Sequence, residues 1–379
     1  MLQTSESKAT KLKKSEVERS GLETPELETS EPTISIIVPC RNERGWIGPM
    51  LESILAQDLG GRVWEAIIAD GMSTDGTREI LNEFSLRNPK VRVIDNPPRT
   101  TPSALNLAIQ QSSGKVIVRM DVHTVYAPDY VRQCVDTLLR TGADNVGGPA
   151  RTRAKGYLHS AIAAAYHSPF ACGGAKSHDP EYEGLVDTVP YGCWWKKTLE
   201  EHGGFDQSLV RNQDDELNFR LLRKGGRIWQ NPAIKFWYTP RASLKNLWWQ
   251  YFQYGFWKVA VMRKHHMPAC LRHLVPGTFA LTIVALLLGA ILGTVVLPQA
   301  ESVKVWLLLA SVVGIYLSGC LLAAVATAKR FGWKLLPILP MIFAIYHFSY
   351  GFGFVTGLLK GKPALKPTDF NPLFTELTR

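Results

Sequence analysis

The sequence predicts an α/β fold with a mostly parallel sheet, followed by helices that cross a membrane. Short apolar runs alternate with helical stretches from residue 33 to about residue 222, which is the pattern of strands joined by crossover helices. From residue 276 the chain instead contains long apolar segments without charge. Segments of that length and composition are typical of transmembrane helices.

The charge distribution separates the same two parts. The 379 residues include 43 Lys and Arg against 33 Asp and Glu, a formal net charge of +10. Thirty of the acidic residues lie in residues 1–216, so the remainder is strongly basic. Basic surfaces suit nucleic acid or anionic lipid, but this one runs into apolar segments, which favours a membrane and argues against nucleic acid. The composition also excludes a disordered, collagen-like or disulfide-stapled chain.

The first part alternates strands and helices in order. Ile34–Val38 is a buried strand that we expect to end at Pro39. Further strands are expected at 66–69, 91–94 and 115–120, with helices at 48–57, 78–84 and 103–111. Four strands joined by three helices predict a parallel, doubly wound sheet, whose ligands lie beyond the carboxyl ends of the strands. The sequence contains neither a P-loop nor a G-x-G-x-x-G motif, so a bound nucleotide must be held differently.

Three polar motifs follow predicted strands or begin a helix. Asp70–Thr77 (DGMSTDGT) closes the second strand and can hydrogen-bond a base or ribose, although the same residues are ordinary in turns and N-caps. Asp121 and His123 close the fourth strand, where alternation places both side chains on one side of an extended chain. They can hold Mg²⁺ or Mn²⁺ against a diphosphate, or they can be an exposed pair in a loop.

The third motif, Gln213–Glu216 (QDDE), begins a helix. Acidic residues at a helix N-terminus are stabilised by the helix dipole, so capping is one interpretation. The functional interpretation is a general base, because a carboxylate beside a sugar hydroxyl can accept its proton.

Taken together and in this order, the motifs resemble the inverting family 2 glycosyltransferases with a GT-A fold, and in particular the ExoA-type succinoglycan-biosynthesis group. The resemblance covers about residues 33–264 and includes P-x-x-N-E at Pro39–Glu43 and D-G-x-S-x-D-x-T at Asp70–Thr77. It also includes D-x-H at Asp121–His123, and G-G-F-D at Gly203–Asp206 before an N-Q-D-x-E-L-N-x-R segment that starts at Asn212.

The resemblance implies a role for individual residues. Asp70 would contact the uracil of a UDP-sugar, Asp121 the ribose or the metal, and His123 the metal, which would be Mg²⁺ or Mn²⁺. Asp214 would be the catalytic base. The remaining nucleotide-sugar contacts would come from Pro39, Arg41, Glu43, Ser73, Arg99 and Asn106.

Two departures from the family pattern are visible. The usual E-D pair is Gln213-Asp214 here, which keeps the base and drops its acidic neighbour. The Q-x-x-R-W motif of processive relatives is replaced by a segment that includes Gln253 and Trp257, with no Arg before the Trp. This favours the addition of one sugar over polymer synthesis, and it leaves Gln253 and Trp257 as candidate contacts to the acceptor.

The segment Ser243–Arg263 is rich in aromatic residues with basic residues near its ends. Such a segment suits the headgroup level of a membrane, and it is also compatible with an ordinary core helix. The interfacial interpretation places the acceptor side of the site at the membrane.

Three apolar segments follow. Gly277–Leu297 and Val305–Ala328 are each long enough to span a bilayer; the alternative is a buried core helix. Leu335–Leu359 is interrupted by Pro337, Pro340, His347 and several glycines, so it either spans or lies in the interface.

Basic residues before the first apolar segment and between the second and third place the catalytic domain in the cytoplasm by the positive-inside rule. Residues 1–32 are polar and lack the apolar stretch of a signal peptide. The six cysteines form no C-x-x-C pair and are expected to be free thiols.

The sequence therefore predicts a disordered tail (1–32), a GT-A domain (33–242), an interfacial segment (243–275), a membrane region (276–359) and a C-terminal tail (360–379). The expected activity is transfer of one sugar from a UDP-sugar to a polyprenyl-diphosphate-linked saccharide in the biosynthesis of exopolysaccharide or surface glycan, by a multi-pass protein of the plasma (inner) membrane. The alternatives are a polyprenyl-phosphate glycosyltransferase and a non-catalytic membrane scaffold.

Overall fold

The computed structural model describes residues 32–268 and 270–360, so the two predicted tails lie outside the described residues except at their inner ends. An eight-stranded sheet forms the centre of the N-terminal half, in the order β3-β2-β1-β4-β9-β6-β10-β8. Its strands are β1 (Ile34–Cys40), β2 (Trp64–Asp70), β3 (Val91–Asp95), β4 (Val116–Arg119), β6 (Asn145–Gly147), β8 (Gly184–Leu185), β9 (Cys193–Trp195) and β10 (Ile228–Gln230). A second sheet joins β5 (Thr124–Tyr126), β11 (Phe236–Tyr238) and β7 (Arg151–Thr152).

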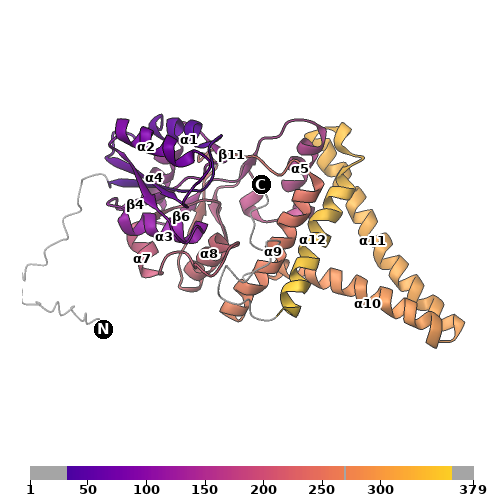
Figure 1. The fold of residues 1–379 in the computed structure, drawn as a ribbon. Helices are drawn as coiled ribbons and strands as arrows, with labels where there is room; N and C mark the ends of the chain where they lie inside the picture. Colours follow the sequence, from indigo (N-terminus) through magenta and orange to yellow (C-terminus); the bar gives the residue numbers. More distant parts are fainter. Residues whose placement is uncertain (1–31, 269, 361–379) are drawn as a thin grey trace, which may run out of the picture. The chain divides into compact units, whose positions relative to one another are not determined.

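Helices connect these strands and then continue beyond them (Figure 1). The helices of the N-terminal half are α1 (Ile47–Leu55), α2 (Thr77–Arg87), α3 (Thr101–Gln111), α4 (Tyr130–Thr141), α5 (Tyr157–Tyr166), α6 (Pro169–Cys172), α7 (Lys196–Glu201) and α8 (Gln213–Arg223). The C-terminal helices are α9 (Leu244–His265), α10 (Val275–Val296), α11 (Gln299–Phe331) and α12 (Leu339–Leu359). Short 3₁₀ turns lie at Lys176–His178, Leu271–His273 and Trp333–Leu335.

The predicted α/β fold is confirmed, with two differences in detail. Strands β3, β2, β1 and β4 are parallel neighbours, as expected, but β9 then pairs antiparallel with β4 and makes the sheet mixed. Strand β1 continues through Pro39 to Cys40 instead of ending before it. The pairing of β1 with β4 stops at Ile37, so Pro39 lies where β1 pairs with β2 alone. A residue without an N–H is tolerated where one neighbouring strand is missing.

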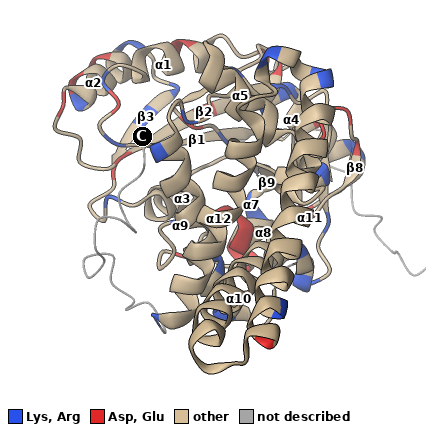
Figure 2. Cartoon of the chain, turned by 90° about the vertical axis from the view of Figure 1, so that its right-hand side faces the viewer, with Lys and Arg blue, Asp and Glu red and all other residues tan. Residues whose placement is uncertain are grey.

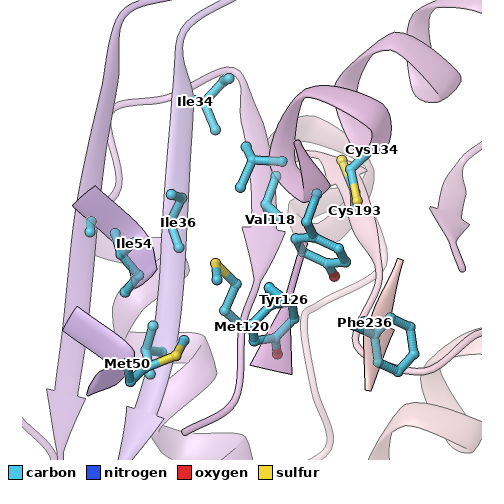
Figure 3. Close-up of a cluster of buried hydrophobic side chains, with 14 of the residues drawn as sticks. Ile34, Ile36, Met50, Ile54, Val118, Met120, Tyr126, Cys134, Cys193 and Phe236 are labelled. Atoms are coloured by element: carbon cyan, nitrogen blue, oxygen red, sulfur yellow. The ribbon is translucent and has the colours of Figure 1, made fainter. Parts of the chain in front are cut away.

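The core of this half is built from alternate residues of the central strands. Ile34, Ile36 and Val38 are essentially inaccessible and pack against α1, and Val118 lies on the same side of the sheet. Figure 3 shows this cluster extending to Phe236 of β11. The small sheet is therefore fixed to the large one by apolar packing.

The C-terminal helices differ strongly in how much of their surface the protein covers. In α10 and in α11, 17% of the most apolar 18-residue stretch is buried. In α12 the share is 44%, because this helix packs along α9. Glycines permit this close packing: a Cβ added to Gly255 of α9 would lie 2.1 Å from the Tyr350 carbonyl oxygen, and one added to Gly353 of α12 would lie 2.0 Å from that of Phe252. Small residues at helix contacts are typical of membrane helices.

All three apolar segments form helices long and apolar enough to cross a membrane. The described part of α10 contains no charged side chain, in contrast to the sheet region, where Lys, Arg, Asp and Glu are scattered over the helices (Figure 2). Two of the three apolar helices therefore leave most of their apolar surface uncovered by protein, as expected for contact with lipid.

Candidate active site

One large cavity is lined by residues from almost every predicted motif. Its volume is about 2130 Å³, and it is lined by the loop after β1, the loop after β4, the start of α8 and parts of α9 to α12. Of the residues predicted from the sequence, those that line it are Pro39, Arg41, Glu43, Arg99, Asp121, His123 and Asp214. The carboxyl ends of neighbouring strands meet at one sheet edge, which brings these distant residues together.

The loops after β1 and β2 support each other through hydrogen bonds. The Asn42 N–H donates to Ser73 Oγ at 2.8 Å, and Asn42 Oδ1 accepts from the Thr74 N–H at 2.9 Å. The Glu43 N–H donates to Thr77 Oγ1 at 2.7 Å. Asn42 has a positive φ of 54°, a conformation that Asn tolerates better than most residues. The P-x-x-N-E and D-G-x-S motifs are thus joined by hydrogen bonds.

Asp70 and Ser73, which the resemblance assigns to nucleotide-sugar contacts, do not line the cavity. The Asp70 side chain is fully buried, and it accepts hydrogen bonds from Ser73 Oγ (2.5 Å) and Arg78 Nε (2.7 Å). Ser73 Oγ is occupied between Asp70 and the Asn42 N–H. Both residues hold the loop in shape, and Asp75 from the same motif lines the cavity instead.

Asn106 is also placed differently from its expected role in nucleotide binding. Its amide makes two hydrogen bonds of 2.8 Å with the backbone of Phe205, donating to the carbonyl oxygen and accepting from the N–H. These bonds fix the Gly203–Asp206 turn to α3, and Asn106 does not line the cavity. The structure thus shows Asn106 holding the Phe205 backbone in place.

We expect Asn106→Ala to lower stability without weakening nucleotide binding. The change leaves a backbone donor and acceptor of Phe205 without partners, which costs about 2–4 kcal/mol for the two groups. Thermal unfolding should show a lower midpoint, while the Kd for the nucleotide changes less than about twofold. The exposed Asn82→Ala is the matched control; a large loss of nucleotide affinity in Asn106→Ala alone would restore its predicted role.

Asp121 and His123 line the same cavity, but not because they alternate on a strand. β4 ends at Arg119, and residues 121–124 form a turn closed by the Thr124 N–H donating to the Asp121 carbonyl oxygen. The Asp121 N–H donates to the Tyr126 hydroxyl at 2.7 Å, which holds the turn against β5. The expectation of an extended chain was wrong.

Arg119 is a residue of the site that sequence reasoning missed. Its side chain is 3% exposed and binds Asp121 with two hydrogen bonds of 2.7 and 2.9 Å. A third hydrogen bond, of 2.5 Å, joins it to Asp214, 95 residues later in the chain. One guanidinium therefore holds the two carboxylates predicted to act at the site side by side. The only sequence signal for it was an Arg within the apolar strand.

The two adjacent acids at the start of α8 have opposite electrostatic environments. Burial raises the pKa of Asp214, and the charge of Arg119 only partly opposes this. Burial also acts to raise the pKa of Asp215, but the Lys258 ammonium, 2.7 Å away, lowers it overall. Acids whose pKa values are driven apart often have different chemical roles, and a raised pKa makes Asp214 the stronger base.

The cavity wall offers some of the ligand atoms that a divalent cation would need. His123 Nε2 lies 2.8 Å from Glu43 Oε2, and Trp46 packs edge-on against the imidazole at 5.2 Å. Among the residues that the structure describes, no three Asp, Glu, His or Cys side chains form a metal cluster. The Asp121 carboxylate and the His123 imidazole fit an ion that takes its other ligands from water and a bound diphosphate.

Gln253 and Trp257 do not line the cavity, so the structure gives no support to their expected contact with the acceptor. Gln253 is 1% exposed and accepts a hydrogen bond from Arg211 Nε at 3.1 Å. Trp257 is fully buried against Leu209. Both residues fix the loop that leads into α8, and Gln250, Tyr254 and Lys258 of the same helix line the cavity instead.

Comparison with known proteins agrees with this geometry. Residues 35–173 match the model of Glycosyl transferase family 2. The chain is 31% identical to the succinoglycan biosynthesis protein ExoA of Rhizobium meliloti, over 79% of this chain and 92% of that protein. It is 25% identical to a dolichyl N-acetyl-α-D-glucosaminyl phosphate 3-β-D-2,3-diacetamido-2,3-dideoxy-β-D-glucuronosyltransferase of Methanococcus voltae, over 88% and 99%.

Among solved structures, the mannosyltransferase PcManGT of Pyrobaculum calidifontis, determined with GDP-Man and Mn²⁺, has a similar fold. The TM-score is 0.55 at 18% identity, over 88% of this chain and 89% of that one. This likeness supports the GT-A fold of the sheet region. With the identity to ExoA extending over nearly the whole of that protein, the chain belongs to glycosyl transferase family 2 and is a glycosyltransferase.

Proposed function

We propose that this enzyme transfers a single sugar, with inversion, from a nucleotide sugar to a saccharide carried on a membrane lipid. The observation that supports this most is the continuity of the cavity. It extends from Arg41 and Arg99 of the donor loops, past Asp214, to Phe279 and Tyr316 of helices α10 and α11. A donor from the aqueous phase and an acceptor on a lipid can therefore enter the same space.

In the proposed reaction the acceptor hydroxyl attacks C1 of the donor sugar from the face opposite the nucleotide. The new C1–O bond forms as the bond between C1 and the diphosphate oxygen breaks, and the electron pair leaves with the nucleoside diphosphate. Asp214 accepts the proton of the hydroxyl. A side chain 33% exposed at the cavity wall is accessible for this step. A direct displacement of this kind inverts the configuration at C1.

The same cavity supports a metal-assisted departure of the nucleotide. Asp121 and His123 would hold Mg²⁺ or Mn²⁺ together with the diphosphate. When bound, such an ion neutralises the charge that develops on the leaving diphosphate. Arg119 keeps the Asp121 carboxylate oriented by binding both of its oxygens.

The lipid acceptor is supported by the helices and by one relative. The name of the Methanococcus voltae protein specifies a dolichyl phosphate-linked sugar as its acceptor. A saccharide hydroxyl requires a base, and the position of Asp214 therefore favours a lipid-linked saccharide over a bare polyprenyl phosphate. We propose that residues 33–242 bind the donor and that the helices from 243 to 359 anchor the enzyme, with the catalytic site on the cytoplasmic face of the plasma membrane.

The direct test is a screen of UDP-sugars and GDP-mannose with the full-length enzyme in membrane extract, with products identified by mass spectrometry. We expect one donor to add a single sugar to a lipid-extractable product and to release its nucleoside diphosphate. The anomeric configuration of that product reports inversion. Formation of a long polymer, or transfer only to bare polyprenyl phosphate, would contradict the proposal.

We expect transfer to require a divalent cation. The His123→Ala change should lower kcat by about 10- to 100-fold. The imidazole is one of two candidate protein ligands in the cavity, and Mn²⁺ should rescue the variant better than Mg²⁺ because it accepts mixed N and O ligands. Activity is measured with EDTA and after addition of each metal. The exposed His266→Asn, outside the cavity, is the control; full activity in EDTA would rule out the metal.

A further inference from the structure

The cavity contains a second polar cluster that the proposed reaction does not use. It consists of Arg211, just before α8, Tyr238 at the end of β11, Arg241 in the following loop, and Tyr254 of α9. None of these residues belongs to the strand-end motifs that predict the donor site. The cluster brings two guanidinium groups and two phenol groups to one wall of the cavity.

The surroundings of both arginines favour a bound anion. Arg241 makes no hydrogen bond or ion pair with any residue in the described ranges, and its Nε atom is buried without a partner. Arg211 donates from Nε to the neutral Gln253. Burial and the nearby charge of Arg241 both lower the pKa of Arg211. Two close positive charges in a partly buried site are unfavourable alone and favourable around an anion.

The two tyrosines supply further donors. The Gln250 amide donates to both phenol oxygens, at 3.2 Å to Tyr238 and 3.1 Å to Tyr254. Because each oxygen is already an acceptor, its own proton is available, and neither proton has an acceptor among the described residues. A site built from guanidinium and hydroxyl donors matches a ligand group that only accepts hydrogen bonds, such as a phosphate.

The wall beyond this cluster becomes aromatic toward the apolar helices. Tyr254 contacts Tyr251, with ring centres 5.4 Å apart, and Tyr251 contacts Tyr346 of α12 at 4.2 Å. Phe279 of α10 and Tyr316 of α11 lie 4.7 Å apart and also line the cavity. The cavity therefore suits a molecule with an anionic group at one end and an apolar chain at the other.

We propose that Arg211, Arg241, Tyr238 and Tyr254 bind the phosphate or diphosphate that joins the acceptor saccharide to its lipid. This rests on the proposed function in taking the acceptor to be lipid-linked. Asp214 lies three residues after Arg211, so a phosphate held here places the first sugars of the acceptor near the base. The diphosphate of the nucleotide sugar shares the same chemistry, and the experiment separates the two sources.

The test measures binding to the full-length enzyme in phosphatidylcholine nanodiscs, without any sugar donor. The probes are farnesyl diphosphate, farnesol, inorganic diphosphate, and whichever of UDP and GDP the wild type binds. We expect farnesyl diphosphate to bind at least about tenfold more tightly than farnesol or inorganic diphosphate. Arg241→Gln and Arg211→Gln should each weaken it about tenfold or more, Arg241→Lys less, and the nucleotide Kd should stay within about twofold.

Lys245→Gln is the matched control, because it removes an exposed basic residue of α9 that does not line the cavity. If the arginine variants weaken the nucleotide as much as farnesyl diphosphate, the cluster belongs to the donor. If farnesol binds as tightly as farnesyl diphosphate, no phosphate site exists. Neither readout needs turnover, so this test confirms or refutes the phosphate site whatever the product screen finds.

Discussion

Replacing Asp214 by Asn is expected to reduce kcat by 10²- to 10⁴-fold while nucleotide affinity changes less than about twofold. Loss of a positioned general base raises the barrier by about 3–5 kcal/mol. The amide keeps the size of the side chain and can still accept the hydrogen bond from Arg119, but it cannot accept a proton at working pH. The measurement is kcat for sugar transfer beside a calorimetric Kd for the nucleoside diphosphate.

The pH dependence of kcat tests the same assignment. A base must be ionised to act, so wild-type kcat should fall as the pH falls through the raised pKa of Asp214. The residual activity of Asp214→Asn should lack that acidic limb. Persistence of the limb in the variant would show that another group titrates.

Asp215→Asn is the closest comparison, because Asp215 lines the same cavity but its carboxylate is bound to Lys258. It should lose less than about tenfold in kcat, together with some stability, since Lys258 is then left buried without its counter-ion. If Asp214→Asn retained more than about a tenth of the activity and Asp215→Asn did not, the base would be Asp215.

The sequence predicted which segments meet at the site better than it predicted where each side chain points. Alternating apolar runs identified the parallel strands, and the ends of parallel strands share one edge, so Pro39 and Asp121 were correctly brought together. The last residue of a strand, however, can face the cavity or the interior. Asp70 faces the interior, where its carboxylate accepts a hydrogen bond from Arg78, eight residues later on α2.

The spacing of apolar residues along the sequence could not predict contacts between distant segments. Asn106 binds the backbone of Phe205, 99 residues away, and no local pattern marks that pair. Arg241 and Arg211 come from separate loops, and only the folded chain brings them to one cavity wall. The family resemblance predicted Asp214 as the base, but it contained no information on the arginine that binds this carboxylate.

Arg119→Gln is expected to combine a loss of kcat of about 10²-fold or more with a shift of the acidic limb to higher pH. The charge of Arg119 lowers the pKa of Asp214, whereas that of Asp121 raises it. Without Arg119, the Asp214 carboxylate therefore binds its proton more tightly, and a higher pH is needed to ionise it. Breaking a buried ion pair also costs about 3–5 kcal/mol of stability, so the folded fraction must be measured with the rates.

Two further variants separate electrostatics from packing. Arg119→Lys keeps the charge but loses the planar fork that binds Asp121 through two nitrogens. Its kcat should therefore fall, while the pH at which kcat declines on the acidic side stays near that of the wild type. Arg78→Gln is the matched control, because Arg78 also bridges two carboxylates, Asp70 and Asp95, outside the cavity. It should lose stability and leave the pH profile in place. An unshifted limb in Arg119→Gln would mean that Arg119 supports the site through its shape alone, because its charge then has no influence on the group that accepts the proton.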